Sequence, residues 1–120
     1  MDSKIRPASQ EIMDVAMSII MDAGDARLEI MNCFRAMAAG NFEECEVKLP
    51  EARQLLAKAH SRQTEIIQSE SEGALREHPL LFIHAQDTLM TVNSELNICS
   101  QMLGICKNYE ARLTALEKRE

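Results

Sequence analysis

A heptad repeat of apolar residues between positions 82 and 113 constrains the fold of this chain more than any other feature. Its two series are Phe82, Leu89, Leu96 and Leu103, and, three residues on, Ala85, Val92, Cys99, Cys106 and Leu113. A pattern sustained over so many repeats is typical of a long helix that packs against other helices. It predicts a helix that begins at about Pro79, a favoured first helical residue, and ends at about Leu116.

The side of this helix opposite the repeat carries very little charge. Between Pro79 and Cys106 the sequence contains only two acidic residues, Asp87 and Glu95, and no basic one apart from His84. A solvated helix face is normally charged, so this helix is expected to be buried on more than one side. Three helices of one small subunit do not provide that burial. Self-association with closed cyclic symmetry is therefore expected.

Two further helices are predicted upstream. The first has apolar residues at helical spacing from Gln10 onward and ends at Gly40, a good C-terminal cap. The second follows Asn41, a good N-cap, and continues to about Glu70. Pro50 interrupts the second pattern. Because proline removes a backbone hydrogen bond, a kink is expected there, or two helices that meet near residue 49.

The remaining segments complete the predicted organisation. The stretch "SESEGALREH", 69–78, has the composition of a loop, and no strand or hairpin signal is present. We therefore expect an all-α chain that forms a three-helix antiparallel bundle, with the third helix central in the assembly. The predicted domain spans 10–116, between a flexible N-terminal tail, 1–9, and a C-terminal tail, 117–120.

Composition excludes several classes of function. With 19 acidic and 13 basic residues the net charge is -6, so the surface should repel nucleic acid and anionic lipid. No apolar run is long enough for a transmembrane helix or a signal peptide, so a cytoplasmic location is expected. The cysteines, Cys33, Cys45, Cys99 and Cys106, contain no CxxC pair and are expected to be reduced core thiols.

A second stripe on the third helix contains the residues most suited to chemistry. Its members are His84, Asp87, Thr91, Ser94, Ile98 and Gln101. A buried carboxylate must be paired, protonated, exposed to a channel or bound to a cation, and symmetry-related copies of Asp87 would suit an oxygen-liking cation such as magnesium. His84 fits three roles: a hydrogen-bonded structural histidine, a nucleophile for phosphorus, or a metal ligand. Spacing alone does not choose among them.

The sequence around His84 resembles a motif of a known protein family. "IHAQDTLMT", 83–91, resembles the phosphorylation-site motif of the IIA component of the lactose and cellobiose (N,N'-diacetylchitobiose) branch of the sugar phosphotransferase system (PTS). Two more blocks agree in order and spacing: "AGDAR", 23–27, followed by "AAGNF", 38–42, and "AHSRQT", 59–64. The resemblance covers roughly residues 10 to 115.

This resemblance implies a function and a set of site residues. It implies a homotrimer in which His84 accepts a phosphoryl group from phospho-HPr and passes it to the cysteine of the cognate IIB component, which serves the membrane component IIC. It also implies that three copies of Asp87 meet one Mg²⁺ on the threefold axis. Candidates for supporting roles are Gln86 within the motif, which could orient the phosphoryl group, and His60 and Gln63, which could line the neighbouring subunit's part of the site. For these three residues an ordinary structural role is an equal alternative.

The chain departs from the family pattern at Thr88, where a second histidine is common; a threonine hydroxyl can still donate a hydrogen bond there. Two other classes of function compete with the phosphoryl carrier. One is a non-catalytic oligomeric helical adaptor or regulatory module. The other is a metal-dependent enzyme that acts through His84 and Asp87, which the absence of a zinc-type ligand spacing disfavours.

Overall fold

The structure is a computed structural model that describes residues 10–72 and 79–119. Within these ranges the chain forms three helices, α1 (Gln10–Ala38), α2 (Phe42–Ser71) and α3 (Leu80–Glu117), and no strand. The prediction of an all-α three-helix bundle is confirmed. The predicted tail at 1–9 and most of the predicted loop, 73–78, lie outside the described residues.

The turn between α1 and α2 forms as the capping residues predict. Gly40 has φ +78, the left-handed conformation that glycine adopts without a steric penalty. The next amide, that of Asn41, donates to the carbonyl of Ala36 at 2.8 Å. The Asn41 side chain then accepts a hydrogen bond from the backbone N–H of Glu44 at 3.3 Å, which caps α2.

Helix α2 differs from the prediction in two places. It runs without interruption through Pro50, so the expectation of two helices that meet near residue 49 is wrong. Pro50 is exposed, and the ring therefore lies on the solvent side, where water can satisfy the carbonyl that loses its partner. The helix also continues to Ser71, so the first residues of the predicted loop are helical.

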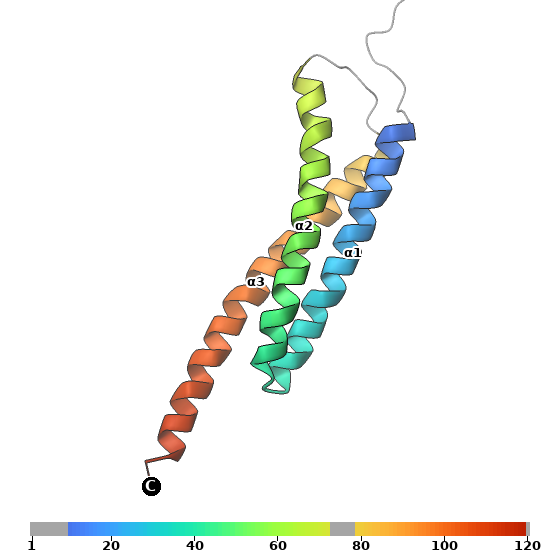
Figure 1. Cartoon of the computed structure of the whole chain (residues 1–120). Coiled ribbons are helices and arrows are strands. Elements are labelled where there is room, and N and C mark those ends of the chain that lie inside the picture. Colours follow the sequence, from blue (N-terminus) through green and yellow to red (C-terminus); the bar gives the residue numbers. More distant parts are fainter. Residues whose placement is uncertain (1–9, 73–78, 120) are drawn as a thin grey trace, which may run out of the picture.

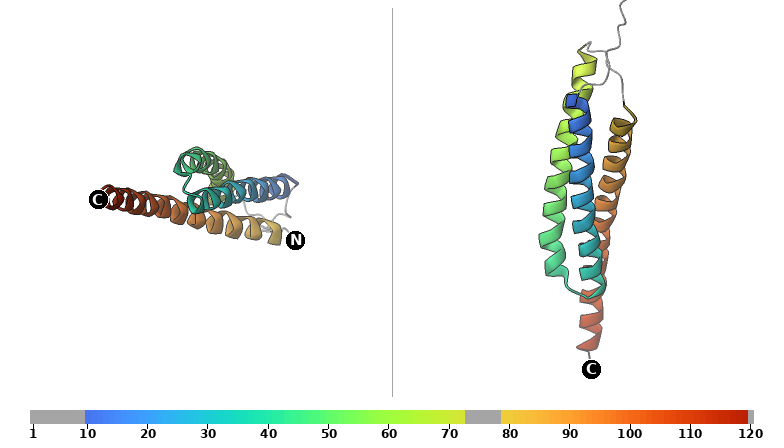
Figure 2. Two further views of the ribbon diagram at one scale, coloured as in Figure 1. Left: turned by 90° about the horizontal axis from the view of Figure 1, so that it is seen from below. Right: turned by 90° about the vertical axis from the view of Figure 1, so that its right-hand side faces the viewer.

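The three helices lie side by side, with α1 and α2 as an antiparallel hairpin and α3 along one side of it (Figures 1 and 2). Helix α1 packs against both other helices, whereas α2 and α3 contact each other least. Figure 1 shows that α3 continues past the α1–α2 turn. Residues 107–119 are accordingly exposed. In the described residues no helix combines the length and apolarity that a bilayer crossing requires.

The core lies between the facing stripes of the three helices. Phe82, Ala85, Leu89, Val92, Leu96, Cys99 and Leu103 are buried, as the heptad repeat predicts. The last two repeat positions differ: Cys106 is half-buried and Leu113 is 58% exposed, because α3 has there passed the end of the hairpin. The buried stripe of α3 therefore ends where its own partners end.

All four cysteines are free, as predicted. Cys33 on α1, Cys45 on α2 and Cys99 on α3 are buried, and the Cys45 thiol donates to the carbonyl of Cys33 at 3.0 Å. Burial raises the pKa of Cys33 to about 11 and that of Cys45 to about 12. These groups are thus protonated core side chains with little thiolate to react.

Candidate functional site

His84 lies one turn into α3 and is exposed. Its imidazole makes no hydrogen bond to any residue in the described ranges, so both ring nitrogens are free of partners from these ranges. Its backbone carbonyl accepts a hydrogen bond from the Thr88 hydroxyl at 2.9 Å. The donor that Thr88 was expected to offer at the site is thus directed to the helix backbone.

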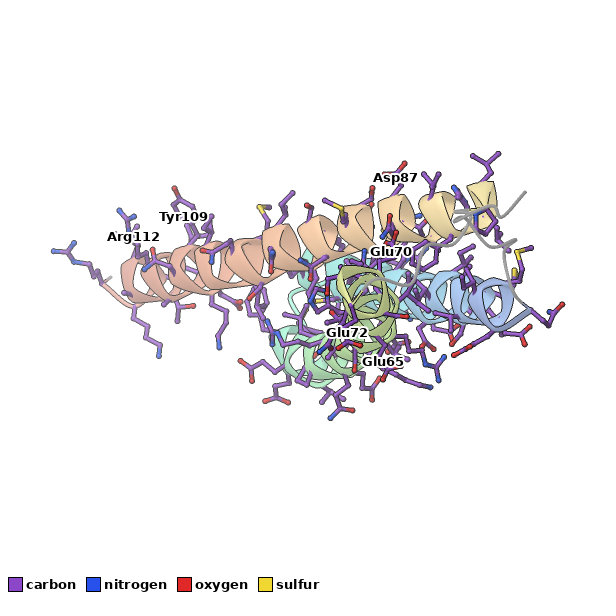
Figure 3. The ribbon with its side chains drawn as sticks, turned by 90° about the horizontal axis from the view of Figure 1, so that it is seen from above. Glu65, Glu70, Glu72, Asp87, Tyr109 and Arg112 are labelled. Carbon is purple, nitrogen blue, oxygen red and sulfur yellow. The ribbon has the colours of Figure 1, made fainter. Side chains whose placement is uncertain are left out.

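Asp87 lies on the side of α3 that faces away from α1 and α2 (Figure 3). Its carboxylate is exposed and has no ion pair or hydrogen bond among residues 10–72 and 79–119. The whole second stripe is exposed in the single chain: His84, Asp87, Thr91, Ser94, Ile98 and Gln101. We call these six residues the α3 outer face. No part of the chain that the structure describes covers this face.

An ion pair defines which flank of α3 faces α1. Arg27 on α1 donates to Glu95 on α3 through Nε at 2.8 Å and Nη2 at 3.2 Å. His84 precedes Glu95 by eleven residues, which is about three turns, so it lies on the same flank. Residue 86 is roughly 200° around the helix from His84, so Gln86 lies on the opposite flank, toward α2.

The other two predicted supporting residues also lie on the α2 flank. His60 and Gln63 line a groove of about 520 Å³ between α2 and α3, together with Arg53, Leu56, Ala57, Leu89, Met90, Asn93 and Leu96. His60 is exposed, and Gln63 is only 9% exposed. Within one chain the structure therefore separates Gln86, His60 and Gln63 from His84.

The N-terminus of α3 provides the electrostatics near His84. Pro79 is the N-cap and offers no side-chain hydrogen bond, and the first turn contains no acidic residue. The first amides of a helix lack partners within it, and the helix dipole places partial positive charge there. A phosphoryl group on a side chain one turn into α3 would thus lie close to a favourable end of the helix.

Sequence reasoning missed a charged contact between α1 and α2. The Asp22 side chain is only 12% exposed and lies 3.9 Å from both Lys58 Nζ and Arg62 Nη1. Its Oδ2 is buried and accepts no hydrogen bond from the described residues. The carboxylate stands one position outside the "AGDAR" block, at the edge of the buried stripe. Sequence spacing predicts such an edge position but not the two cations from α2.

The carboxylate of Asp87 fits the implied magnesium ion only in an assembly. Magnesium prefers oxygen ligands, and the unpartnered carboxylate on an uncovered face is a suitable donor. Within the described residues, however, no cluster of three His, Cys, Asp or Glu residues forms a metal site. One chain would supply a single ligand, so such a site would require further copies of Asp87.

Comparison with known proteins decides the family. Residues 14–107 match the family model "PTS system, Lactose/Cellobiose specific IIA subunit". The chain belongs to this family. It is 35% identical, over 81% of its length and 88% of the relative's, to the lichenan-specific phosphotransferase enzyme IIA component of Bacillus subtilis. The chain is therefore a IIA component of a sugar phosphotransferase system.

Solved structures agree with this family membership. PtcA from S. mutans superimposes with a TM-score of 0.81 at 34% identity, over 83% of this chain and 98% of that one. The chitobiose IIA of Escherichia coli, solved as a complex with HPr, has the same fold at a TM-score of 0.72 and 24% identity, over 85% of this chain and 99% of that one. These relatives are named for different sugars or for none, so the likeness identifies the IIA component and not its sugar.

Proposed function

We propose that this IIA component carries a phosphoryl group on His84, accepted from phospho-HPr and passed to the cysteine of its cognate IIB component. The observation that carries the proposal is an exposed imidazole without a partner among the described residues, inside the segment that the family model matches. The chitobiose relative is titled as a complex with HPr, which supports the donor. The relay would act in the cytoplasm, during uptake of a lactose-, cellobiose- or chitobiose-type disaccharide through IIC.

The chemistry requires a nucleophile and a donor whose bond to phosphorus breaks easily. A neutral imidazole nitrogen of His84 attacks the phosphorus of phospho-HPr, a nitrogen–phosphorus bond forms on His84, and the nitrogen–phosphorus bond in the donor breaks. In the second step the IIB thiolate attacks, a sulfur–phosphorus bond forms, and the imidazole leaves. The exposed ring gives both partners access, and the uncapped start of α3 favours the phosphoryl charge.

The assembly we propose is a homotrimer through the α3 outer face. This face is left uncovered by the described residues of its own chain and contains only one formal charge, Asp87. In a cyclic trimer the α1 flank of one α3, with His84, would meet the α2 flank of the next, with Gln86, His60 and Gln63. Three Asp87 carboxylates would then hold one Mg²⁺, whose charge would offset their mutual repulsion.

A labelling experiment tests the relay. The full chain is incubated with radiolabelled phosphoenolpyruvate, enzyme I and HPr, and acid-labile phosphate on the chain is measured. Wild type should become labelled and should lose the label when IIB is added, whereas His84→Ala should stay unlabelled. His78→Ala, which removes a histidine outside the motif, should label normally. An unlabelled wild type would overturn the relay and leave the helical adaptor as the function.

A further inference from the structure

The exposed end of α3 concentrates positive charge in an otherwise acidic chain. Residues 107–119 contain four basic and two acidic residues, whereas the whole chain has a net charge of -6. Lys107 forms an ion pair with Glu46 of α2, and Lys118 is the C-cap, where a helix end favours cations. Neither reason applies to Arg112, which is exposed and lies inside the helix.

The Arg112 guanidinium forms no ion pair with any residue in the described ranges. It lies over the ring of Tyr109, with its central carbon 5.8 Å from the ring centroid. The two acidic residues of the same segment, Glu110 and Glu117, are about 160° and 140° around the helix from Arg112. They therefore lie on other sides of α3, and the helix itself supplies no counter-charge to the guanidinium.

Arg112 shares a side of α3 with Asp87. It follows Asp87 by 25 residues, which is about seven turns of a straight helix and, in a heptad, the step from one seam position to the other. Figure 3 shows both side chains, with Tyr109, on the side of α3 that faces away from α1 and α2. A cyclic assembly of parallel α3 helices that brings three copies of Asp87 together thus brings three copies of Arg112 together, about 37 Å further along the helix.

A groove on the surface of α3 places further donors beside Arg112. Its volume is about 340 Å³, and it is lined by Gln101, Gly104, Ile105, Asn108, Tyr109 and Arg112. The N–H groups of a guanidinium and of side-chain amides match the oxygens of phosphate or sulfate. The contact with the Tyr109 ring restrains the guanidinium and uses none of its N–H donors.

We infer that the exposed end of α3 forms an oxyanion site, in which three copies of Arg112 surround one phosphate or sulfate ion on the axis of the assembly. The inference rests on the trimer of the proposed function and not on the phosphoryl relay. Three guanidinium groups without counter-charges repel one another. An ion with two negative charges offsets that repulsion and accepts hydrogen bonds from all three groups.

Matched single variants of the full chain test the site. Arg112→Gln removes the proposed ligand, and Lys118→Gln removes a cation from the same end of α3 but about 120° around the helix. The concentration at which the assembly dissociates is measured by light scattering after size exclusion, in chloride, phosphate or sulfate at constant magnesium and ionic strength. Calorimetric titrations with inorganic phosphate, and separately with a phosphate monoester, give the stoichiometry of binding.

In wild type, phosphate and sulfate should lower the dissociation concentration by about tenfold or more relative to chloride, with one ion bound per three chains. Lys118→Gln should respond to the same extent. Arg112→Gln should assemble more tightly than wild type in chloride, because it removes like charge, and should lose the response to both oxyanions. An undiminished response in Arg112→Gln, or one ion bound per chain, would overturn the site.

Two other results would also overturn the axial ion. Binding of the monoester without inorganic phosphate would assign the groove to an organic phosphate. Weaker assembly of Arg112→Gln in chloride would show that Arg112 pairs with a carboxylate of a neighbouring copy.

The outcome separates this inference from the proposed function. If wild type is trimeric and is labelled on His84 but does not respond to phosphate or sulfate, only the oxyanion site is wrong. If wild type is monomeric in every salt, the proposed trimer fails and the oxyanion site fails with it, whatever the labelling of His84 shows.

Discussion

The outer faces of α1 and α3 both leave apolar side chains uncovered, but they differ in what surrounds them. The α3 outer face is polar apart from Ile98 and contains a single carboxylate, Asp87. The α1 outer face, which consists of Met17, Met21, Gly24, Leu28 and Met31, is rich in methionine and has carboxylates beside it. A permanent interface between copies of an acidic chain must avoid repulsion between like charges. The α3 outer face therefore suits contact between copies of the chain better than the α1 outer face does.

A charge on the α3 outer face should have the largest effect. Ile98→Glu would place three carboxylates in the proposed trimer interface, where unpaired charge is very unfavourable. We expect monomers in place of trimers at micromolar concentration. Light scattering after size exclusion measures the mass of the assembly. Met21→Glu is the control on the other face and should keep the trimer mass. A trimeric Ile98→Glu would remove the distinction between the faces.

The second prediction concerns the one carboxylate of the α3 outer face. Asp87→Leu should strengthen assembly in the absence of magnesium, because it removes like charges that meet on the axis. Dissociation on dilution should shift to a concentration about tenfold lower or more, since one pKa unit of repulsion corresponds to a factor of ten. Added magnesium should stabilise the wild type and leave Asp87→Leu unaffected. Weaker assembly of the variant would contradict a central carboxylate cluster.

The third prediction uses the glycine of the α1 outer face. Gly24→Ala should raise the free energy of unfolding by about 0.5–1 kcal/mol, because the new methyl group enters open space and the helix loses less backbone entropy. Thermal denaturation followed by circular dichroism measures this gain. A lower unfolding free energy would mean that another part of the assembly already covers this position.

The smallest effect should come from the ion pair that joins the two helices. The side chains of Arg27 and Glu95 are 43% and 37% exposed, so solvent screens their attraction. Glu95→Gln should lower the free energy of unfolding by no more than about 1 kcal/mol, and salt should reduce the difference. Urea denaturation at low and high salt measures it. Glu110→Gln, on the exposed end of α3, should change nothing; an equal loss there would show that the pair has no specific role.

Most of the fold follows from the sequence because its signals are local. The heptad repeat predicted the buried stripe of α3, and Gly40 with Asn41 predicted the turn after α1. Pro50 misled the prediction because proline removes a local hydrogen bond, while packing of the flanking turns keeps α2 continuous. A sequence pattern does not measure that packing.

The site was only partly predictable for a related reason. The resemblance identified His84, but the supporting residues Gln86, His60 and Gln63 lie on the opposite flank of α3 within one chain. Spacing along a helix gives the angle between two residues, yet it does not say which neighbouring helix each one faces. The Arg27–Glu95 pair supplied that information. The contact of Asp22 with Lys58 and Arg62 was missed because it depends on how α1 and α2 align.

The extension of α3 beyond the hairpin has a practical consequence for experiments. Glu117 ends the helix about 33 residues after His84, which corresponds to about 50 Å of helical rise. A fluorophore or surface linkage attached there would sit far from the proposed phosphoryl site and from the first turns of α1 (Figure 1). Immobilisation through this end would present His84 outward, so binding of donor and acceptor proteins can be measured in sequence on one captured sample.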